Sequence, residues 1–136
     1  MTNKEKQNKS LENTLITTAM SSTKDSQPPK SKRANKTVTI TLYEVLKNNP
    51  YKFKQYDLFY EVHINKLGKN KEDLKLDTYK LQRSELCSLL GWGIHGNKEG
   101  ELSLVNSQSK HYKELLNNSS IIKKKAFEKY PKLKET

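Results

Sequence analysis

Residues 91–105 read GWGIHGNKEGELSLV and hold four of the chain's five glycines. Gly91, Gly93 and Gly96 also spell G-x-G-x-x-G, the spacing found in loops that cradle phosphate groups. Those loops open a helix, whose N-terminus attracts the anion. Here the turn at residues 97–100 leads instead into an alternating apolar segment, which is typical of a second strand. The stretch therefore predicts a β-hairpin, and the G-x-G-x-x-G match is interpreted as accidental.

The glycines then have structural roles. We expect Gly96 and Gly100 to supply positive φ angles at the hairpin loop. Gly91 and Gly93 flank Trp92, and we expect them to let another backbone approach the indole.

The bulk composition indicates a single domain with a small core. The chain has 136 residues, of which only 32% are hydrophobic, so little apolar surface is available for burial. No apolar stretch approaches a membrane span, and the first ten residues lack the apolar region of a signal peptide, so we expect a cytoplasmic protein without membrane contact. The single cysteine, Cys87, excludes an intrachain disulfide and is interpreted as a small buried side chain.

The net charge of +11 suggests a polyanionic partner, but its distribution weakens that reading. Only two of the 26 basic residues are arginine, the residue that direct base readout favours. Residues 1–36 carry eight basic and three acidic groups, and residues 123–136 carry six and two. The excess therefore lies at the two ends, which act either as solvated tails or as nonspecific arms on a polyanion.

Apolar periodicity predicts the principal elements. Residues 37–49 read as a helix that ends before Pro50. Residues 56–65 alternate and read as a half-buried antiparallel strand, with His63 on its solvated face. Residues 73–90 are compatible with a helix.

Weaker signals lie at the two ends of the chain. Residues 11–19 offer a thin β-branched run suited to an edge strand. Ser109 can cap a short helix in which Tyr112, Leu115 and Leu116 point inward. A last turn or helix is expected from Ser120. The fold class predicted is α+β: an antiparallel sheet containing the hairpin near 91–105, packed with two to four helices.

Several short motifs resemble those of a family of small, mostly bacterial proteins known only as a domain of unknown function. That family has N-P-Y-x-F, D-x-L-F-x-V and G-W-G-I-H-x-N-x-E-G motifs. The corresponding segments here are Asn49–Phe53, Asp57–Val62 and Gly91–Gly100. Further matches are the segment Asn13–Ala19, Pro28-Pro29, Ser109, Tyr112, Ser120 and Lys125–Phe127. The resemblance spans about residues 11–128.

The resemblance implies one α+β domain over residues 11–128, with a loop near 21–36 that belongs to the fold. Residues 1–10 and 129–136 are then expected to be disordered basic tails. It implies no activity, because none is established for the family. One segment departs from the family pattern C-x-R-A-S-P-L-x-K-R: residues 80–89 read KLQRSELCSL, in which only Ser84 and Leu86 match. If that segment builds a reactive or anion-binding site, this chain lacks it unless Arg83 substitutes.

Three functions are compatible with these features. The leading hypothesis is a non-enzymatic binding module for nucleic acid or a protein partner, with Trp92, His95, Arg83 and Tyr112 as binding residues. One alternative is a small enzyme or ligand-binding protein with a pocket at Trp92 and His95, to which His63 or His111 could add a second polar group. The other is a protein-directed regulator or inhibitor. His95 itself is either a locally bonded surface histidine or a binding or acid–base residue at the mouth of a cleft. No catalytic residues, metal ligands or cofactor are predicted, because the sequence has neither a nucleophile–base signature nor metal-ligand spacing.

Overall fold

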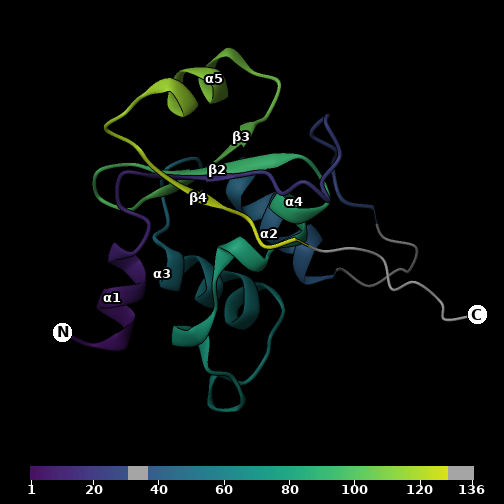
Figure 1. Cartoon of the computed structure of the whole chain (residues 1–136). Coiled ribbons are helices and arrows are strands. Elements are labelled where there is room, and N and C mark those ends of the chain that lie inside the picture. The colour runs from purple at the N-terminus through teal and green to yellow at the C-terminus, as the bar shows by residue number, and fades with distance from the viewer. Residues whose placement is uncertain (31–36, 129–136) are drawn as a thin grey trace, which may run out of the picture.

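The computed structural model describes residues 1–30 and 37–128. Within them, a four-stranded sheet lies between one helix and a larger helical layer (Figure 1). The strands are β1 (Thr14–Thr17), β2 (Trp92–Gly96), β3 (Leu102–Asn106) and β4 (Ile122–Lys125), in the order β3-β2-β1-β4. Helix α5 (Lys110–Asn117) lies on one face of the sheet. The other face carries α1 (Asn3–Lys9), α2 (Val38–Asn48), α3 (Gln55–Tyr60) and α4 (Glu85–Ser88).

The predicted hairpin is confirmed as β2 and β3, which pair antiparallel from Trp92↔Asn106 to Gly96↔Leu102. The Asn97 side-chain oxygen closes its loop by accepting the backbone N–H groups of Glu99 and Glu101, at 3.1 and 2.9 Å. Gly100 completes the turn with a φ of +83°. The loop is therefore fixed by an asparagine and a glycine in the positions where turns favour them.

The sheet is mixed, which corrects the expected antiparallel arrangement. Strand β1 pairs antiparallel with β2, but β4 runs parallel to β1 on its other side. Thus residues 14–17 form a central strand and not an edge strand. Residues 122–125 form a strand where a last turn or helix was predicted. Five α-helices are present in the described residues, one more than the two to four expected.

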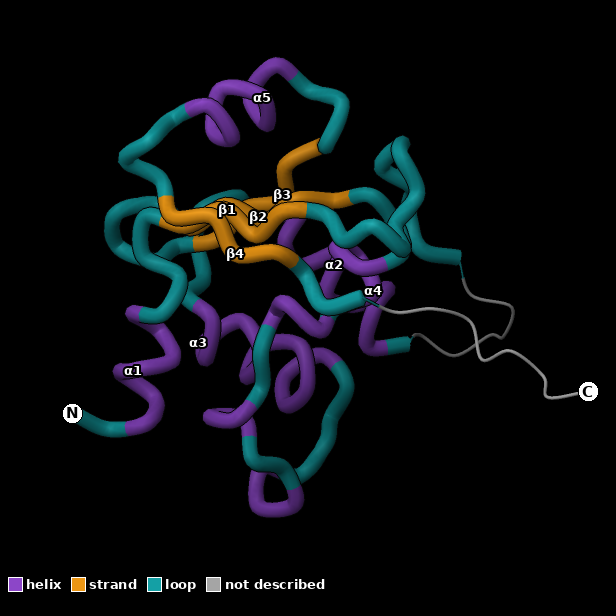
Figure 2. The backbone as a smooth tube through the Cα atoms, viewed as in Figure 1, coloured by secondary structure: helices purple, strands orange, loops and turns teal. Residues whose placement is uncertain are grey.

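Residues 55–66 are helical, so the strand predicted over 56–65 is wrong. Helix α3 continues directly into a π-helical segment, η1 (Glu61–Lys66), as the continuous helical tube in Figure 2 illustrates. The buried positions 55, 58, 59, 62 and 63 recur at helical spacing. The aromatic and branched residues between them produced an alternation that resembles a strand. His63, expected on a solvated face, is only 6% exposed.

Residues 73–90 form short turns in place of the expected helix. Three 3₁₀ turns, η2 (Lys71–Asp73), η3 (Leu76–Thr78) and η4 (Leu81–Arg83), precede α4. The Gln7 amide donates to the carbonyl oxygens of Leu76 and Tyr79, at 2.8 and 2.7 Å. The Leu81 N–H donates to the side-chain oxygen of Gln55 at 2.9 Å. These two glutamines occupy backbone groups that a continuous helix would use for its own hydrogen bonds.

Residues 1–10, where the sequence predicts a disordered basic tail, contain helix α1. Thr2 caps it by accepting the Glu5 N–H at 3.1 Å, and Gln7 is buried against the turns that follow α3. Residues 129–136, the other predicted tail, and residues 31–36 of the predicted loop lie outside the described residues.

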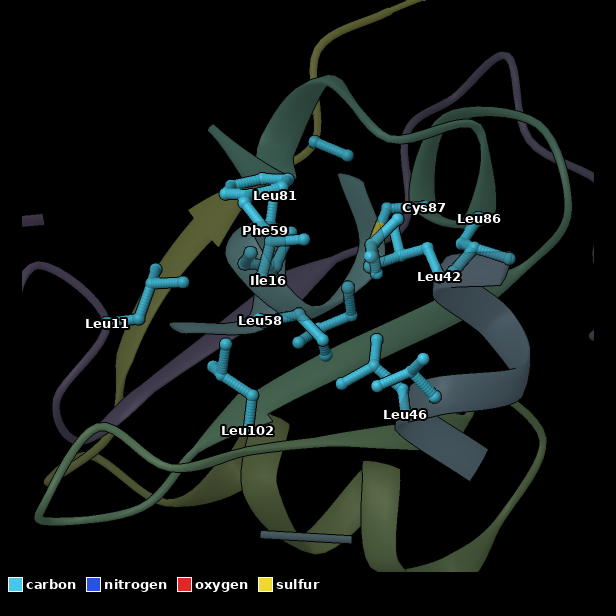
Figure 3. Packing of buried hydrophobic residues seen from close by; sticks show 14 of the residues in the cluster. Leu11, Ile16, Leu42, Leu46, Leu58, Phe59, Leu81, Leu86, Cys87 and Leu102 are labelled. Carbon is cyan, nitrogen blue, oxygen red and sulfur yellow. The ribbon is translucent and has the colours of Figure 1, made fainter. Parts of the chain in front are cut away.

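The main core lies between the sheet and the larger helical layer (Figure 3). Ile16 and Ile94 contribute from the sheet, Leu42 and Leu46 from α2, and Leu58 from α3. On the opposite face, a smaller cluster under α5 joins Leu15, Val105, Tyr112 and Leu115. Leu116, expected to point inward, is 40% exposed.

Candidate functional site

The G-x-G-x-x-G segment is packed against the chain's own backbone. A Cβ at Gly96 would collide with the Leu11 carbonyl oxygen, and one at Gly91 would collide with the carbonyl oxygen of Asp25. Carbonyl oxygens carry partial negative charge and repel an anion, whereas a phosphate loop offers N–H groups. These glycines are therefore close-approach points for backbone, as predicted for Gly91, and Gly96 does not need a positive φ.

Trp92 is held in the fold from two sides. Its indole N–H donates to the Gln27 carbonyl oxygen at 2.8 Å, and its ring lies 5.5 Å from that of Tyr43 on α2. The indole therefore fastens the segment that carries Pro28-Pro29 onto the hairpin.

Tyr112 is likewise structural. Its ring occupies the space beside Gly93, where a Cβ would lie 2.6 Å from a ring carbon. Its hydroxyl accepts the Thr18 N–H at 3.3 Å, and the residue is 6% exposed. Gly93 thus makes room for the Tyr112 ring beside the neighbouring strand β1. The prediction that it lets another backbone approach Trp92 does not describe this contact.

His95 lies on the face of the sheet opposite Trp92, in a group that we call the His–Tyr–His cluster: Tyr51, His95 and His111. The Tyr51 hydroxyl is 2.8 Å from His95 Nδ1 and 3.3 Å from His111 Nε2. Burial lowers the pKa of His95, and the neighbouring His111 lowers it further. Burial raises the pKa of Tyr51. His95 Nε2 is buried without a hydrogen-bond partner in the described part of the chain.

Arg83 lies in a different place, at the end of η4. Its guanidinium is 5.9 Å from the ring centre of Phe127, and it lines a cavity of about 400 Å³ that we call the His63 cavity. Neither Trp92 nor His95 lines this cavity. The four predicted binding residues therefore do not form one surface.

The His63 cavity is open to solvent and is lined by residues of α2, α3, η1 and the turns η3–α4. Its apolar wall contains Val38, Leu42, Phe59 and Tyr79. Its polar groups are Thr39, His63, Thr78, Lys80, Arg83, Ser84 and Glu85. A volume of this size falls within the usual range for small-molecule sites, roughly 300–1,000 Å³.

Three rings stack edge to face around one side of this cavity. The Phe59 and Tyr79 rings are 5.4 Å apart at 84°, and His63 lies 5.2 Å from Tyr79 at 72°. Phe59 and His63 are four positions apart in the helical segment, so they share one face. Their contacts fix the orientation of the imidazole.

The environment of His63 favours the neutral imidazole. Burial lowers its pKa, and the Lys69 ammonium lowers it further. The Lys69 Nζ lies 3.4 Å from His63 Nδ1, and an ammonium group can only donate. Nδ1 therefore accepts, which leaves the ring hydrogen on Nε2 and gives the cavity lining a neutral N–H donor.

The charged groups of the cavity lie on the turn segment that departs from the family pattern. Lys80 and Arg83 are cationic, and Glu85 is acidic; the Thr39 hydroxyl is 3.5 Å from a Glu85 carboxylate oxygen. Of the residues that line the cavity, Arg83 was predicted as a binding residue, and His63 only as an alternative second polar group beside His95. A helical reading of residues 55–66 would have placed Phe59 and His63 on one buried face. No local pattern indicates that Tyr79 and Lys80 join them.

The one cysteine is unsuited to nucleophilic chemistry. Cys87 is fully buried, and burial raises its thiol pKa to about 12, so the thiolate nucleophile is suppressed. Within residues 1–30 and 37–128, no group of three His, Cys, Asp or Glu side chains could hold a metal ion. None of the helices in this part of the chain is long and apolar enough to cross a membrane.

The fold and these sites define a small α+β protein with a mixed four-stranded sheet, a ligand-sized cavity and a separate histidine–tyrosine cluster. Residues 6–131 match the family described as "Family of unknown function (DUF6157)", and the chain belongs to that family. The resemblance deduced from the motifs is thereby confirmed at the level of a family of unknown function. Comparison with curated proteins and with solved structures finds no significant match.

Proposed function

We propose that this protein is a non-enzymatic binding module whose ligand is a small organic anion with an aromatic or apolar body, held in the His63 cavity. The observation that carries the proposal is the convergence, on one cavity, of an aromatic wall and two cationic side chains, Lys80 and Arg83. Arg83 can bind a carboxylate or phosphate with paired N–H donors. The neutral His63 imidazole supplies a further N–H donor, and no charge on this ring has to be desolvated when a ligand binds.

The cavity also has features that define its ligand. Phe59 and Tyr79 are held in a fixed edge-to-face pair, so the wall is preformed for a flat ring. The carboxylate of Glu85 would repel a second anionic group, so we expect one anionic group per ligand.

The test is calorimetric titration of the full-length protein with benzoate and phenyl phosphate, and with neutral benzyl alcohol for comparison. We expect the two anions to bind more tightly than the alcohol. Arg83→Gln should remove that difference, and Arg83→Lys should restore part of it, because lysine keeps the charge but not the paired donors. Phe59→Leu should weaken the binding of all three compounds.

Failure of both anions to bind, or equal binding by wild type and Arg83→Gln, would contradict this assignment. Ser107→Ala serves as the matched control, because Ser107 does not line the cavity.

Nucleic-acid binding is a second candidate, favoured by the net charge of +11 and by the edge strand β4. Lys123, Lys124 and Lys125 follow one another on this strand, and Lys123 and Lys125 are exposed. In the structure these lysines already have partners within the chain: Lys124 donates to the Ser10 carbonyl oxygen at 2.8 Å, and Lys125 lies 3.4 Å from the Glu128 carboxylate. A polyanion would therefore have to displace these contacts.

Fluorescence anisotropy with labelled single- and double-stranded DNA and RNA, at low and moderate salt, tests this candidate. Salt-sensitive binding that is weakened in Lys123→Gln/Lys125→Gln would support it. Absence of binding at both salt concentrations would remove it and favour a protein partner.

A further inference from the structure

We propose that the His–Tyr–His cluster is a binding site for a divalent first-row transition-metal ion, with His95 Nδ1, His111 Nε2 and Tyr51 Oη as its donor atoms. The cluster lies outside the His63 cavity and has no part in the function proposed above. Imidazole nitrogens are the preferred protein ligands of Zn²⁺ and Cu²⁺.

Two of the three donor separations fit one shared ion. Ligand atoms about 2.0–2.1 Å from an ion lie roughly 3 Å apart when they occupy neighbouring coordination positions. The Tyr51 hydroxyl oxygen is 2.8 Å from His95 Nδ1 and 3.3 Å from His111 Nε2. The distances from the phenol oxygen to the two imidazole nitrogens are therefore close to those between neighbouring ligands of one ion.

The hydrogen positions also favour this use of His95. An O–H donor makes a shorter hydrogen bond than an N–H donor, about 2.7–2.8 Å against 2.9–3.0 Å. The 2.8 Å contact is consistent with a Tyr51 O–H that donates to His95 Nδ1. His111 Nε2, 3.3 Å from the Tyr51 oxygen, serves as a ligand in the tautomer that carries its ring hydrogen on Nδ1, and the exposed ring exchanges that hydrogen with water. His95 Nδ1 thus presents a lone pair to the cluster, as a metal ligand must.

This tautomer places the His95 ring hydrogen on Nε2, which has no partner among the described residues. Metal binding at Nδ1 leaves that hydrogen where it is, so it adds no new buried unsatisfied group. It replaces the two hydrogen bonds of the tyrosine with coordination bonds and releases the Tyr51 hydroxyl proton to solvent. Because burial raises the pKa of Tyr51, the tyrosine is the weakest of the three donors.

Three separate elements hold the donors in place. His95 lies within β2, the strand between β1 and β3. Tyr51 has a φ of +56°, uncommon for a residue with a side chain, and its N–H donates to the Leu102 carbonyl oxygen at 2.9 Å. His111 lies in the first turn of α5, whose N-terminus is capped by Ser109 at 3.1 Å. Donors fixed independently in this way are preorganised for an ion.

The exposure of the cluster defines the kind of site. His111 is exposed, so water can fill the remaining coordination positions. The donors include no carboxylate, and Lys110 and Lys113 flank His111 in the sequence. We therefore expect micromolar affinity rather than that of a closed structural site, with Cu²⁺ bound more tightly than Zn²⁺.

The test is calorimetric titration of the full-length protein with Cu²⁺ and with Zn²⁺ in a non-coordinating buffer, together with the visible spectrum of the Co²⁺ form. We expect one saturable site. His111→Ala should weaken binding roughly tenfold or more, and Tyr51→Phe by a smaller factor, because it keeps the ring and removes only the oxygen. Asn117→Ala, an exposed position on the same helix, is the matched control and should bind as wild type does.

His111 is exposed, so its removal leaves the core intact, and circular dichroism can verify the fold of each variant. Absence of saturable binding by wild type would overturn the proposal. Binding that His111→Ala leaves unchanged would also overturn it, because the ion would then be held elsewhere, for example by His63.

Discussion

The carbonyl oxygen of Leu11 lies against the Cα atom of Gly96, in the space that a Cβ would occupy. Leu11 is 3% exposed and leads from α1 into β1, and Gly96 ends β2, where it pairs with Thr14. The contact fixes how the first helix enters the sheet. The contact also explains why position 96 requires a glycine, without a role in binding phosphate.

Gly96→Ala is expected to destabilise the protein by about 2–4 kcal/mol, because the Leu11 backbone would have to move away from the added Cβ. Gly68→Ala is the control. Gly68 has a φ of +67° but nothing within 4 Å of its Cβ position, so only the conformational cost of about 1 kcal/mol applies. Urea denaturation of both variants measures the difference, and equal losses would show that the Leu11 contact is not rigid.

Gln55→Leu is expected to cost about 2–4 kcal/mol, because it leaves several buried polar groups without partners. Gln55 is 4% exposed; it accepts from the Leu81 N–H and donates to Gln7 and Ser10 at 3.1 and 2.9 Å. Asn65→Ala removes an exposed side-chain hydrogen bond to Glu61 and should change stability by less than about 0.5 kcal/mol. Thermal unfolding compares them. If Gln55→Leu left the stability unchanged, α1 and the turns after α3 would not be joined through this side chain.

Cys87 should resist thiol reagents in the folded protein. The thiol is fully buried and its pKa is raised to about 12, so both access and thiolate fraction are low. We expect labelling by a disulfide reagent at pH 8 only when denaturant unfolds the chain. Asn117→Cys in a Cys87→Ala background supplies an exposed thiol for comparison, and rapid labelling of the native wild type would contradict the buried placement.

Stability should fall as the pH is lowered through the range in which an unfolded histidine titrates. The folded protein lowers the pKa of His63 below 6.5, so the unfolded chain binds its proton more readily. The stabilisation is therefore fully present above pH 6.5 and is lost as the pH falls toward the folded pKa. In urea titrations between pH 8 and pH 5, His63→Phe keeps an aromatic ring and should show a shallower decline than wild type. Parallel curves would mean that His63 titrates normally in the folded state.

Local signals in the sequence determined the elements whose hydrogen bonds close within a short segment. The hairpin follows from its glycines and Asn97, helix α2 from its apolar spacing with Thr37 before it and Pro50 after it, and helix α5 from the Ser109 cap. In each, the residues that start and stop the element are adjacent to it, so the pattern can be recognised without tertiary contacts.

Tertiary contacts decided the rest. In helix α3 the Tyr56 N–H is accepted by the side chain of Asn8, which belongs to α1 and is 48 positions away, so no local cap marked the helix. Strand β4, with three lysines among its four residues, is a strand because β1 supplies its hydrogen-bond partners. The His63 cavity and the His–Tyr–His cluster join residues from elements distant in the sequence, since Tyr51 meets His111 across 60 positions. The sequence by itself determined the hairpin, the helices α2 and α5, and the α+β fold class of the chain. Only the packing of those segments decided which side chains meet, because contacts between distant residues have no counterpart in local periodicity.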